Sequence, residues 1–510
     1  MGILSSIVLV PVLAVLVILF IPASRLKLIK QVSLVATGIT VIQAVWLVLD
    51  FLKRIGGVHG TAKPAGTTLA LEYVERFPWL GKLGIEYFMG ADGISVLMIL
   101  LTAVVIFCGV FASWNNEYRG KEFFIFLLLL VTGVFGVFAA NDLFLFFLFY
   151  EVAVLPMYVL IGLWGTGPRE YSAMKLTLML MGGSALIAVG IVVLYFQSGA
   201  TTFSMIEIAQ KGIPASTQFW LFPVMFFGFG TLGGLWPFHT WSPDGHASAP
   251  TAVSMLHAGV LMKLGGYGCL KMMYLMPEGA KAWGTFFMVL TTINIFYGAL
   301  IAIKKTDLKY ITAYSSVSHC GLVLFGLGTL NATAMQGACV QMYAHGLMTA
   351  LFFGLVGMIY GRTHTRYITE MGGLLKVMPF LGVAYMIGGM SGLGLPGLAG
   401  FIAEIQVFIG AFANASWGHR VMTILAASSV VTSAVYLLRA LTKMLYGQMK
   451  DPHHEHLTDA TFIERIPLVI LIFLLAFSGC WPTWMTRMIE YSLVPVMNQL
   501  QRGAALTAGM

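Results

Sequence analysis

Several ionisable side chains lie inside long apolar runs of this sequence. Glu151 follows LFLFFLFY, Lys263 follows HAGVLM, and Glu404 follows FIA. A charge at the centre of a lipid bilayer costs from about 2.5 kcal/mol upward, so such residues generally face the protein interior, pair, and serve transport or proton relays. The candidates for proton transfer are Glu151, Lys175, Lys263, His319, His345 and Glu404.

These candidates are expected to form a row parallel to the membrane plane, because all but Lys175 lie in the middle of their runs. Carboxylates, amines and imidazoles in such a row can load and release protons, with waters bridging the gaps. Structural interpretations stay open beside this one. Glu151 and Lys263 can form a purely structural buried pair, the two histidines can serve as neutral hydrogen-bonding groups between helices, and Glu404 can cap helix amides. Lys175 can extend to the membrane surface.

The elements that position these residues are transmembrane helices. Of the 510 residues, 58% are hydrophobic and 10% are charged, whereas a soluble domain has roughly 25% charged residues. This composition excludes soluble, collagen-like, disordered and nucleic-acid-binding proteins. The chain has no glycine-rich nucleotide motif and no paired-cysteine motif, so we expect it to hold no cofactor, no redox centre and no metal.

Fourteen apolar runs are candidate membrane spans. They cover about 3–22, 32–52, 91–113, 122–140, 143–164, 173–196, 218–236, 250–275, 283–303, 308–329, 334–360, 378–413 with a break, 420–446 and 466–486. We interpret the first as a retained helix and not a cleaved signal. Only the polar connection 53–88 is long, so residues 1–510 are expected to form one membrane domain. Basic residues gather in connections after odd-numbered runs, which predicts cytoplasmic loops there and both termini on the opposite side.

Two runs are irregular where a helix should be regular. WPFHTWSPDGHASAP at 236–250 and SGLGLPGLAG at 391–400 combine proline and glycine with apolar residues. They predict discontinuous seventh and twelfth helices. Broken helices at corresponding places in two halves are typical of inverted-repeat transporters, and the spacing predicts five-helix repeats over about 122–275 and 283–446. The predicted fold class is therefore an all-α polytopic membrane protein.

Four motifs make the chain resemble the antiporter-like membrane subunits of respiratory complex I. They lie at 148–165, 236–268, 304–321 and 393–408. The resemblance covers nearly the whole chain and is closest to the chain M type of bacterial NADH-quinone oxidoreductase, called subunit 4 in mitochondria. It implies fourteen helices with inverted repeats over the fourth to eighth and the ninth to thirteenth.

The resemblance also implies function and partners. Such a chain is the proton-translocating part of an NADH:quinone oxidoreductase in the bacterial inner (plasma) membrane, next to other antiporter-like subunits. NADH, FMN, iron–sulfur clusters and quinone then belong to partner subunits. By the same resemblance, Glu151, Lys175, Lys263 and Glu404 match the family's ionisable residues on the fifth, sixth, eighth and twelfth helices. His319 and His345 lie in the matching segments of the tenth and eleventh.

One position departs from the family pattern. In TLGGLWPFH, Leu232 stands where the family has a lysine that pairs with the fifth-helix glutamate. Three outcomes for Glu151 stay open: it pairs with Lys175, it stays protonated, or the subunit is divergent with altered stoichiometry. The alternative functions are a subunit of a multisubunit sodium/proton antiporter, a subunit of a membrane-bound hydrogenase, and a structural subunit that does not pump.

Overall fold

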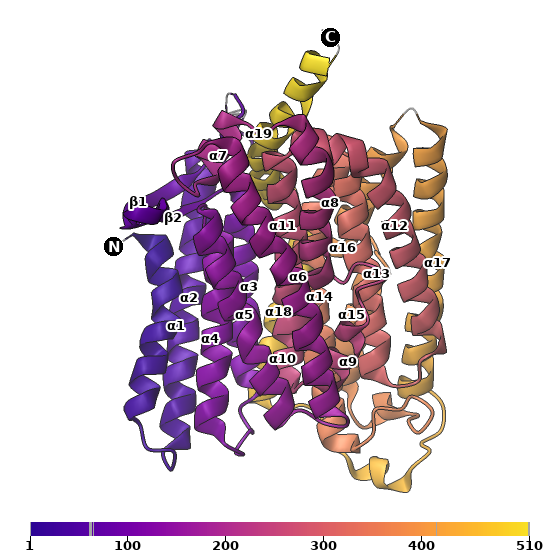
Figure 1. Ribbon diagram of the computed structural model, residues 1–510. Coiled ribbons are helices and arrows are strands. Elements are labelled where there is room, and N and C mark those ends of the chain that lie inside the picture. The colour runs from indigo at the N-terminus through magenta and orange to yellow at the C-terminus, as the bar shows by residue number, and fades with distance from the viewer. Residues whose placement is uncertain (1, 61–63, 65, 415, 508–510) are drawn as a thin grey trace.

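The computed structural model describes residues 2–60, 64, 66–414 and 416–507. Within them, eleven helices are long and apolar enough to cross a membrane. These are α1 (Ile3–Phe20), α2 (Leu26–Arg54), α3 (Gly93–Ala112), α4 (Gly120–Ala139), α5 (Leu143–Trp164), α6 (Arg169–Ser198), α12 (Pro277–Lys304), α13 (Leu308–Gly328), α14 (Ala332–Thr363), α17 (Trp417–Leu445) and α18 (Phe462–Cys480). They stand side by side as a bundle (Figure 1).

Three further crossings consist of shorter pieces, which brings the described total to the predicted fourteen. The pieces are α8 (Ala215–Leu232) with α9 (Trp241–Ser248), α10 (Thr251–Leu256) with α11 (Met262–Leu275), and α15 (Pro379–Gly392) with α16 (Ala399–Phe412). A π-helical turn at His257–Leu261 joins α10 to α11. The seventh and twelfth crossings are therefore discontinuous, as predicted, and the eighth carries a local distortion.

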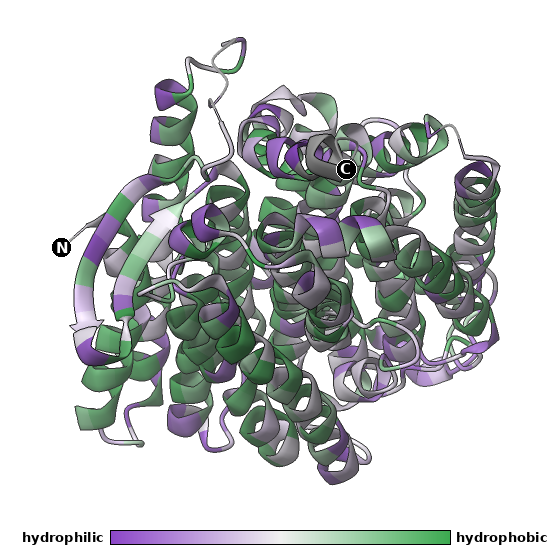
Figure 2. Ribbon diagram, turned by 45° about the horizontal axis from the view of Figure 1, so that its top comes forward, coloured by the Kyte–Doolittle hydropathy of each residue, from purple (hydrophilic) through white to green (hydrophobic). Residues whose placement is uncertain are grey.

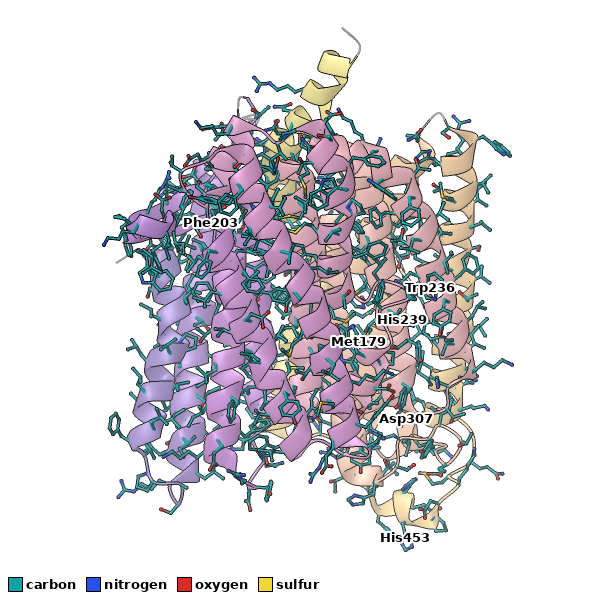
Figure 3. The ribbon with its side chains drawn as sticks, in the orientation of Figure 1. Met179, Phe203, Trp236, His239, Asp307 and His453 are labelled. Atoms are coloured by element: carbon teal, nitrogen blue, oxygen red, sulfur yellow. The ribbon has the colours of Figure 1, made fainter. Side chains whose placement is uncertain are left out.

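Glycines explain where the twelfth crossing breaks. Gly394 and Gly397 between α15 and α16 have φ of +64° and +92°, which L-residues with a side chain rarely adopt. In the seventh crossing, α8 ends at Leu232 and Gly234 has φ +76°. Trp236 and His239 lie in this interruption, well away from Asp307 and His453 at the lower end of the molecule (Figure 3).

The connection after α2 contains a hairpin that the sequence analysis did not predict. Strands β1 (Glu72–Leu80) and β2 (Ile85–Ala91) pair antiparallel. Two other unpredicted elements are the short helix α7 (Met205–Lys211) and the C-terminal helix α19 (Thr483–Thr507). All three lie toward the upper face in Figure 1, where the two termini also lie.

Hydrophobic residues dominate the helices, and hydrophilic ones concentrate in β1, at helix ends and in loops (Figure 2). The interior is also apolar: almost the whole of α3, α11, α13 and α14 is buried. These helices form the centre of the bundle. Ionisable residues on them are therefore shielded from water and lipid by surrounding helices.

Candidate functional site

Four of the predicted residues form a continuous buried row. The Lys263 ammonium donates to the Ala258 carbonyl and lies 2.7 Å from Nδ1 of His345. The His345 and His319 rings have centroids 5.2 Å apart. His319 Nδ1 lies 3.7 Å from Glu404 Oε1. All four residues are buried, with exposures from 2% to 9%, so the row crosses the apolar interior and not a surface groove.

Four helices supply one residue each to this row. Lys263 lies on α11, His319 on α13, His345 on α14 and Glu404 on α16. The π-helical turn comes immediately before α11 and contains Ala258, whose carbonyl holds the Lys263 ammonium. A π-bulge inside a helix is frequent at functional sites. The interruption before α16 similarly brings the backbone of Gly394 against the Glu404 carboxylate.

Polar atoms along the row have unused hydrogen-bonding capacity. Nε2 of His319 and Nε2 of His345 have no hydrogen-bond partner among the described residues. A small cavity lies beside the Glu404 end and is lined in part by Ser318, Ser429 and Ser433. Buried imidazole nitrogens normally find a protein or water partner. The row therefore has the chemistry of a hydrogen-bonded relay, with protonatable groups and polar space between helices.

Lys175 and Glu151 do not join the row through any contact in the described residues. The Lys175 ammonium lies 2.7 Å from Asp244 Oδ2 on α9, and the Tyr310 hydroxyl donates to Oδ1 of the same carboxylate at 3.1 Å. Glu151 Oε1 is buried and has no partner among the described residues. Leu232, at the end of α8, is fully buried. Lys175 thus takes Asp244 as its partner, and the pairing of Glu151 with Lys175 is not formed.

Two buried histidines were not selected from the sequence. The rings of His246 on α9 and His257 in the π-helical turn have centroids 4.0 Å apart. His246 Nε2 is 3.5 Å from the Met262 sulfur, while both His257 nitrogens have no partner among the described residues. The sequence did contain a signal for them, because both lie in the motif at 236–268 that also contains Lys263. They extend the set of titratable groups from Lys263 toward the end of the bundle where α9 lies.

A buried ion pair was also missed. Lys271 Nζ on α11 lies 2.9 Å from Asp92 Oδ2, and the two side chains are 3% and 6% exposed. The residues are 179 positions apart in the chain, so nothing in the local sequence pairs them. The only local signal is that Lys271 follows Lys263 by two helical turns.

Comparisons with known proteins agree with this arrangement. The family model described as "NADH:quinone oxidoreductase/Mrp antiporter, TM" matches residues 140–435. NAD(P)H-quinone oxidoreductase chain 4 of Gloeobacter violaceus is 34% identical over 98% of this chain and 92% of its own length. NADH-quinone oxidoreductase subunit M of Rhodobacter capsulatus is also 34% identical, over 92% of this chain and 90% of its own.

A solved structure gives the same result for the fold. A chain of respiratory complex I from Thermus thermophilus with bound NADH superposes with a TM-score of 0.85 at 25% identity. The match covers 98% of this chain and 99% of that chain. The relationship predicted from the four motifs is confirmed: the chain belongs to the NADH:quinone oxidoreductase/Mrp antiporter family of membrane proteins and is similar to its chain 4 (subunit M) members.

Proposed function

We propose that the chain is a proton-translocating membrane-arm subunit of an NADH:quinone oxidoreductase (complex I). Electron transfer in partner subunits drives proton movement through this chain. NADH, FMN, iron–sulfur clusters and quinone are bound by those partners, and this chain holds none of them. Its neighbours are other antiporter-like subunits in a bacterial inner membrane. The relatives with matching length support this assignment, because their names describe NAD(P)H- or NADH-quinone oxidoreductases.

The observation that carries the proposal is the buried row from Lys263 through His345 and His319 to Glu404. Its members come from four helices and from distant parts of the sequence, yet neighbouring groups along the row lie close together. Burial of ionisable groups is costly, and a stable membrane helix bundle does not require four of them in a row. Proton transfer, by contrast, requires groups that can bind and release a proton, as these four can.

The proposed transfer balances at each step. The Lys263 ammonium gives a proton to Nδ1 of neutral His345, which releases a proton from Nε2 toward His319. His319 passes a proton to the Glu404 carboxylate, which becomes a neutral acid. Water bridges the space between the two rings. Each imidazole returns to its neutral form, so one proton has moved from Lys263 to Glu404.

Glu151 and Lys175 have a different proposed role, in the first of two five-crossing units (α4–α11 and α12–α17). Lys175, paired with Asp244, fixes positive charge beside the broken seventh crossing. Glu151 is a protonatable group that exchanges a proton in this first unit. A second candidate function, a divergent subunit that does not pump, is favoured by one observation: Leu232 leaves Glu151 without its family partner.

The test uses inverted membrane vesicles that contain the assembled complex. NADH-driven quinone reduction and proton uptake are measured for the wild type, Lys263→Met and Lys281→Met. Met keeps the length and apolar stem of lysine, so Lys263→Met should reduce both rates at least tenfold without loss of the complex. Lys281, partly exposed and paired with Glu278 on α12, is the control and should keep both rates. Wild-type rates in Lys263→Met would contradict the proposal, and sodium-dependent exchange in the same vesicles would favour an antiporter.

A further inference from the structure

A second polar path starts at Lys263 and runs along α11. Tyr267 and Lys271 follow Lys263 at intervals of four residues, so the three lie on one side of the helix. Eight residues at 1.5 Å each place Lys271 about 12 Å from Lys263 along the helix axis. α11 rises from α10 toward the face that carries β1 and β2 (Figure 1). The series therefore leads from the middle of the bundle to that face.

The Tyr267 hydroxyl is part of a hydrogen-bonded cluster. It lies 2.7 Å from Ser95 Oγ on α3 and 3.4 Å from the Phe138 carbonyl at the end of α4. Tyr267 and Ser95 are each 1% exposed. A hydroxyl both donates and accepts a hydrogen bond. Tyr267 and Ser95 can therefore each accept a proton while giving up their own.

Asp92 and Lys271 form the end of this cluster. Asp92 precedes α3 and accepts from the Ser95 amide at 2.8 Å, while its other oxygen is 2.9 Å from the Lys271 ammonium. The ammonium lies 5.0 Å from the centroid of the Tyr267 ring. Asp92 comes directly after β2, which ends at Ala91. A carboxylate thus stands where the buried path reaches the hairpin.

Packing alone explains this arrangement poorly. An ion pair this deeply buried gives little net stability, because the loss of hydration offsets the attraction of the charges. The α3 and α11 helices are already joined without it, since the Tyr267 hydroxyl on α11 lies 2.7 Å from Ser95 Oγ on α3. The charges are placed at the end of a hydroxyl chain that begins one turn from the central lysine.

We propose that Tyr267, Ser95 and Asp92, with Lys271 as a positioning residue, form a proton branch from Lys263 to the hairpin face of the membrane. This inference rests on the proposed function. A proton leaves the Lys263 ammonium and reaches Tyr267 Oη through one bridging water. Tyr267 passes its own hydroxyl proton to Ser95, and Ser95, whose amide already donates to Asp92 Oδ1, passes its own through a second bridging water to the Asp92 carboxylate. Lys263 is left neutral and Asp92 becomes a neutral acid. Lys271, 2.9 Å from Asp92 Oδ2, fixes the position of the carboxylate at the end of the path.

The test compares variants of the assembled complex in inverted vesicles. Tyr267→Phe removes only the hydroxyl and should lower proton translocation and quinone reduction at least fivefold. Its control is Tyr385→Phe, because Tyr385 is equally buried at 1% exposed but lies on α15; it should keep both rates. Complex yield and reduction of a soluble acceptor by NADH establish that each variant is assembled.

A second set of variants separates transfer from structure. The double variant Lys271→Met with Asp92→Asn removes both charges, and asparagine retains the N-cap of α3. It should assemble at wild-type yield and lose translocation at least fivefold, while Lys271→Arg keeps it. Wild-type translocation in Tyr267→Phe and in the double variant, with loss in Lys263→Met, would overturn the branch and leave the proposed function intact. Wild-type translocation in Lys263→Met as well would overturn the proposed function itself.

Discussion

At the scale of single residues, Glu404 is the last acceptor of the buried row. Its carboxylate is 3.7 Å from His319. Glu404→Gln keeps the size of the side chain but cannot take up a proton at neutral pH, so we expect proton uptake in inverted vesicles to fall at least tenfold. Glu404→Asp should retain more activity because it still ionises. A pumping rate in Glu404→Gln equal to that of the wild type would show that the row does not end at this residue.

Glu151 should be less sensitive than Glu404. Oε1 of Glu151 has no partner among the described residues, and Lys175 is engaged by Asp244. Replacing Glu151 by Gln therefore leaves no buried cation without an anionic partner. We expect Glu151→Gln to lower NADH-driven proton uptake by less than the loss in Glu404→Gln measured in the same vesicles. An equal or greater loss would mean that Glu151 finds a cation in a neighbouring subunit.

The residues of the site were only partly predictable. Each member of the row stands out in the sequence as an ionisable group inside an apolar run. Their order in space depends on the packing of helices far apart in the chain, which no local pattern contains. The same reason explains why the Lys271–Asp92 pair was missed. The partner of Lys175 was missed although Asp244 lies in a motif that was singled out, because a motif does not show which way its side chains point.

At the scale of elements, the interruption between α15 and α16 positions Glu404. A Cβ added to Gly394 would stand 2.4 Å from Glu404 Oε2, whereas one added to Gly397 would meet nothing within 4 Å. Both glycines have positive φ, so both alanine variants carry backbone strain, roughly 1 kcal/mol or more. We expect Gly394→Ala to reduce proton uptake severalfold and Gly397→Ala to reduce it much less. Equal losses of proton uptake in the two variants would show that backbone strain alone causes the effect.

The start of α5 should make stability depend on pH. Asp142 caps this helix and accepts from the amides of Phe144, Leu145 and Glu86. Burial is the main cause that raises the pKa of Asp142 to about 6, and those amides oppose it. The folded form therefore binds this proton more tightly than the unfolded form, whose pKa is about 3.9.

This difference in pKa makes the folded form less stable as the pH rises. The free energy of unfolding should fall as the pH rises from about 4 through 6 and then level off, by roughly 3 kcal/mol for two pKa units. Asn in place of Asp142 keeps the cap and removes the titration. In Asp142→Asn, the melting temperature of the purified chain should therefore differ less between pH 5 and pH 7.5 than in the wild type. An unchanged difference would exclude Asp142 as its source.

Hydropathy predicted the long helices because a span needs about 20 apolar residues in succession. It predicted both discontinuous crossings because proline and glycine interrupt those runs. It did not detect β1 and β2 in the polar connection after α2, nor the short helix α7. The helix α19 was also missed, because polar residues such as Arg487, Glu490 and Gln499 interrupt its apolar positions.

At the scale of the whole molecule, the two faces differ in charge. The lower ends of the helices carry the basic residues, including Lys304 at the end of α12 and Arg362 at the end of α14. The upper face carries the hairpin and both termini (Figure 1). Positive residues in short loops stay in the cytoplasm, which predicts that the lower face is the cytoplasmic one. The row runs in the interior between these faces, and the proposed branch along α11 leads toward the upper face.

This orientation predicts which sites a membrane-impermeant maleimide can label. Lys82 lies in the exposed turn between β1 and β2, and Glu455 lies in the exposed turn at Pro452–His456. Cys480 is exposed and the other four cysteines are buried, so Cys480→Ser gives a background without an exposed thiol. In that background, Lys82→Cys should be labelled from the outer side in spheroplasts, while Glu455→Cys should be labelled only in inverted vesicles. The reverse labelling pattern would show that the chain has the opposite orientation in the membrane. The branch along α11 would then lead from the cytoplasmic face.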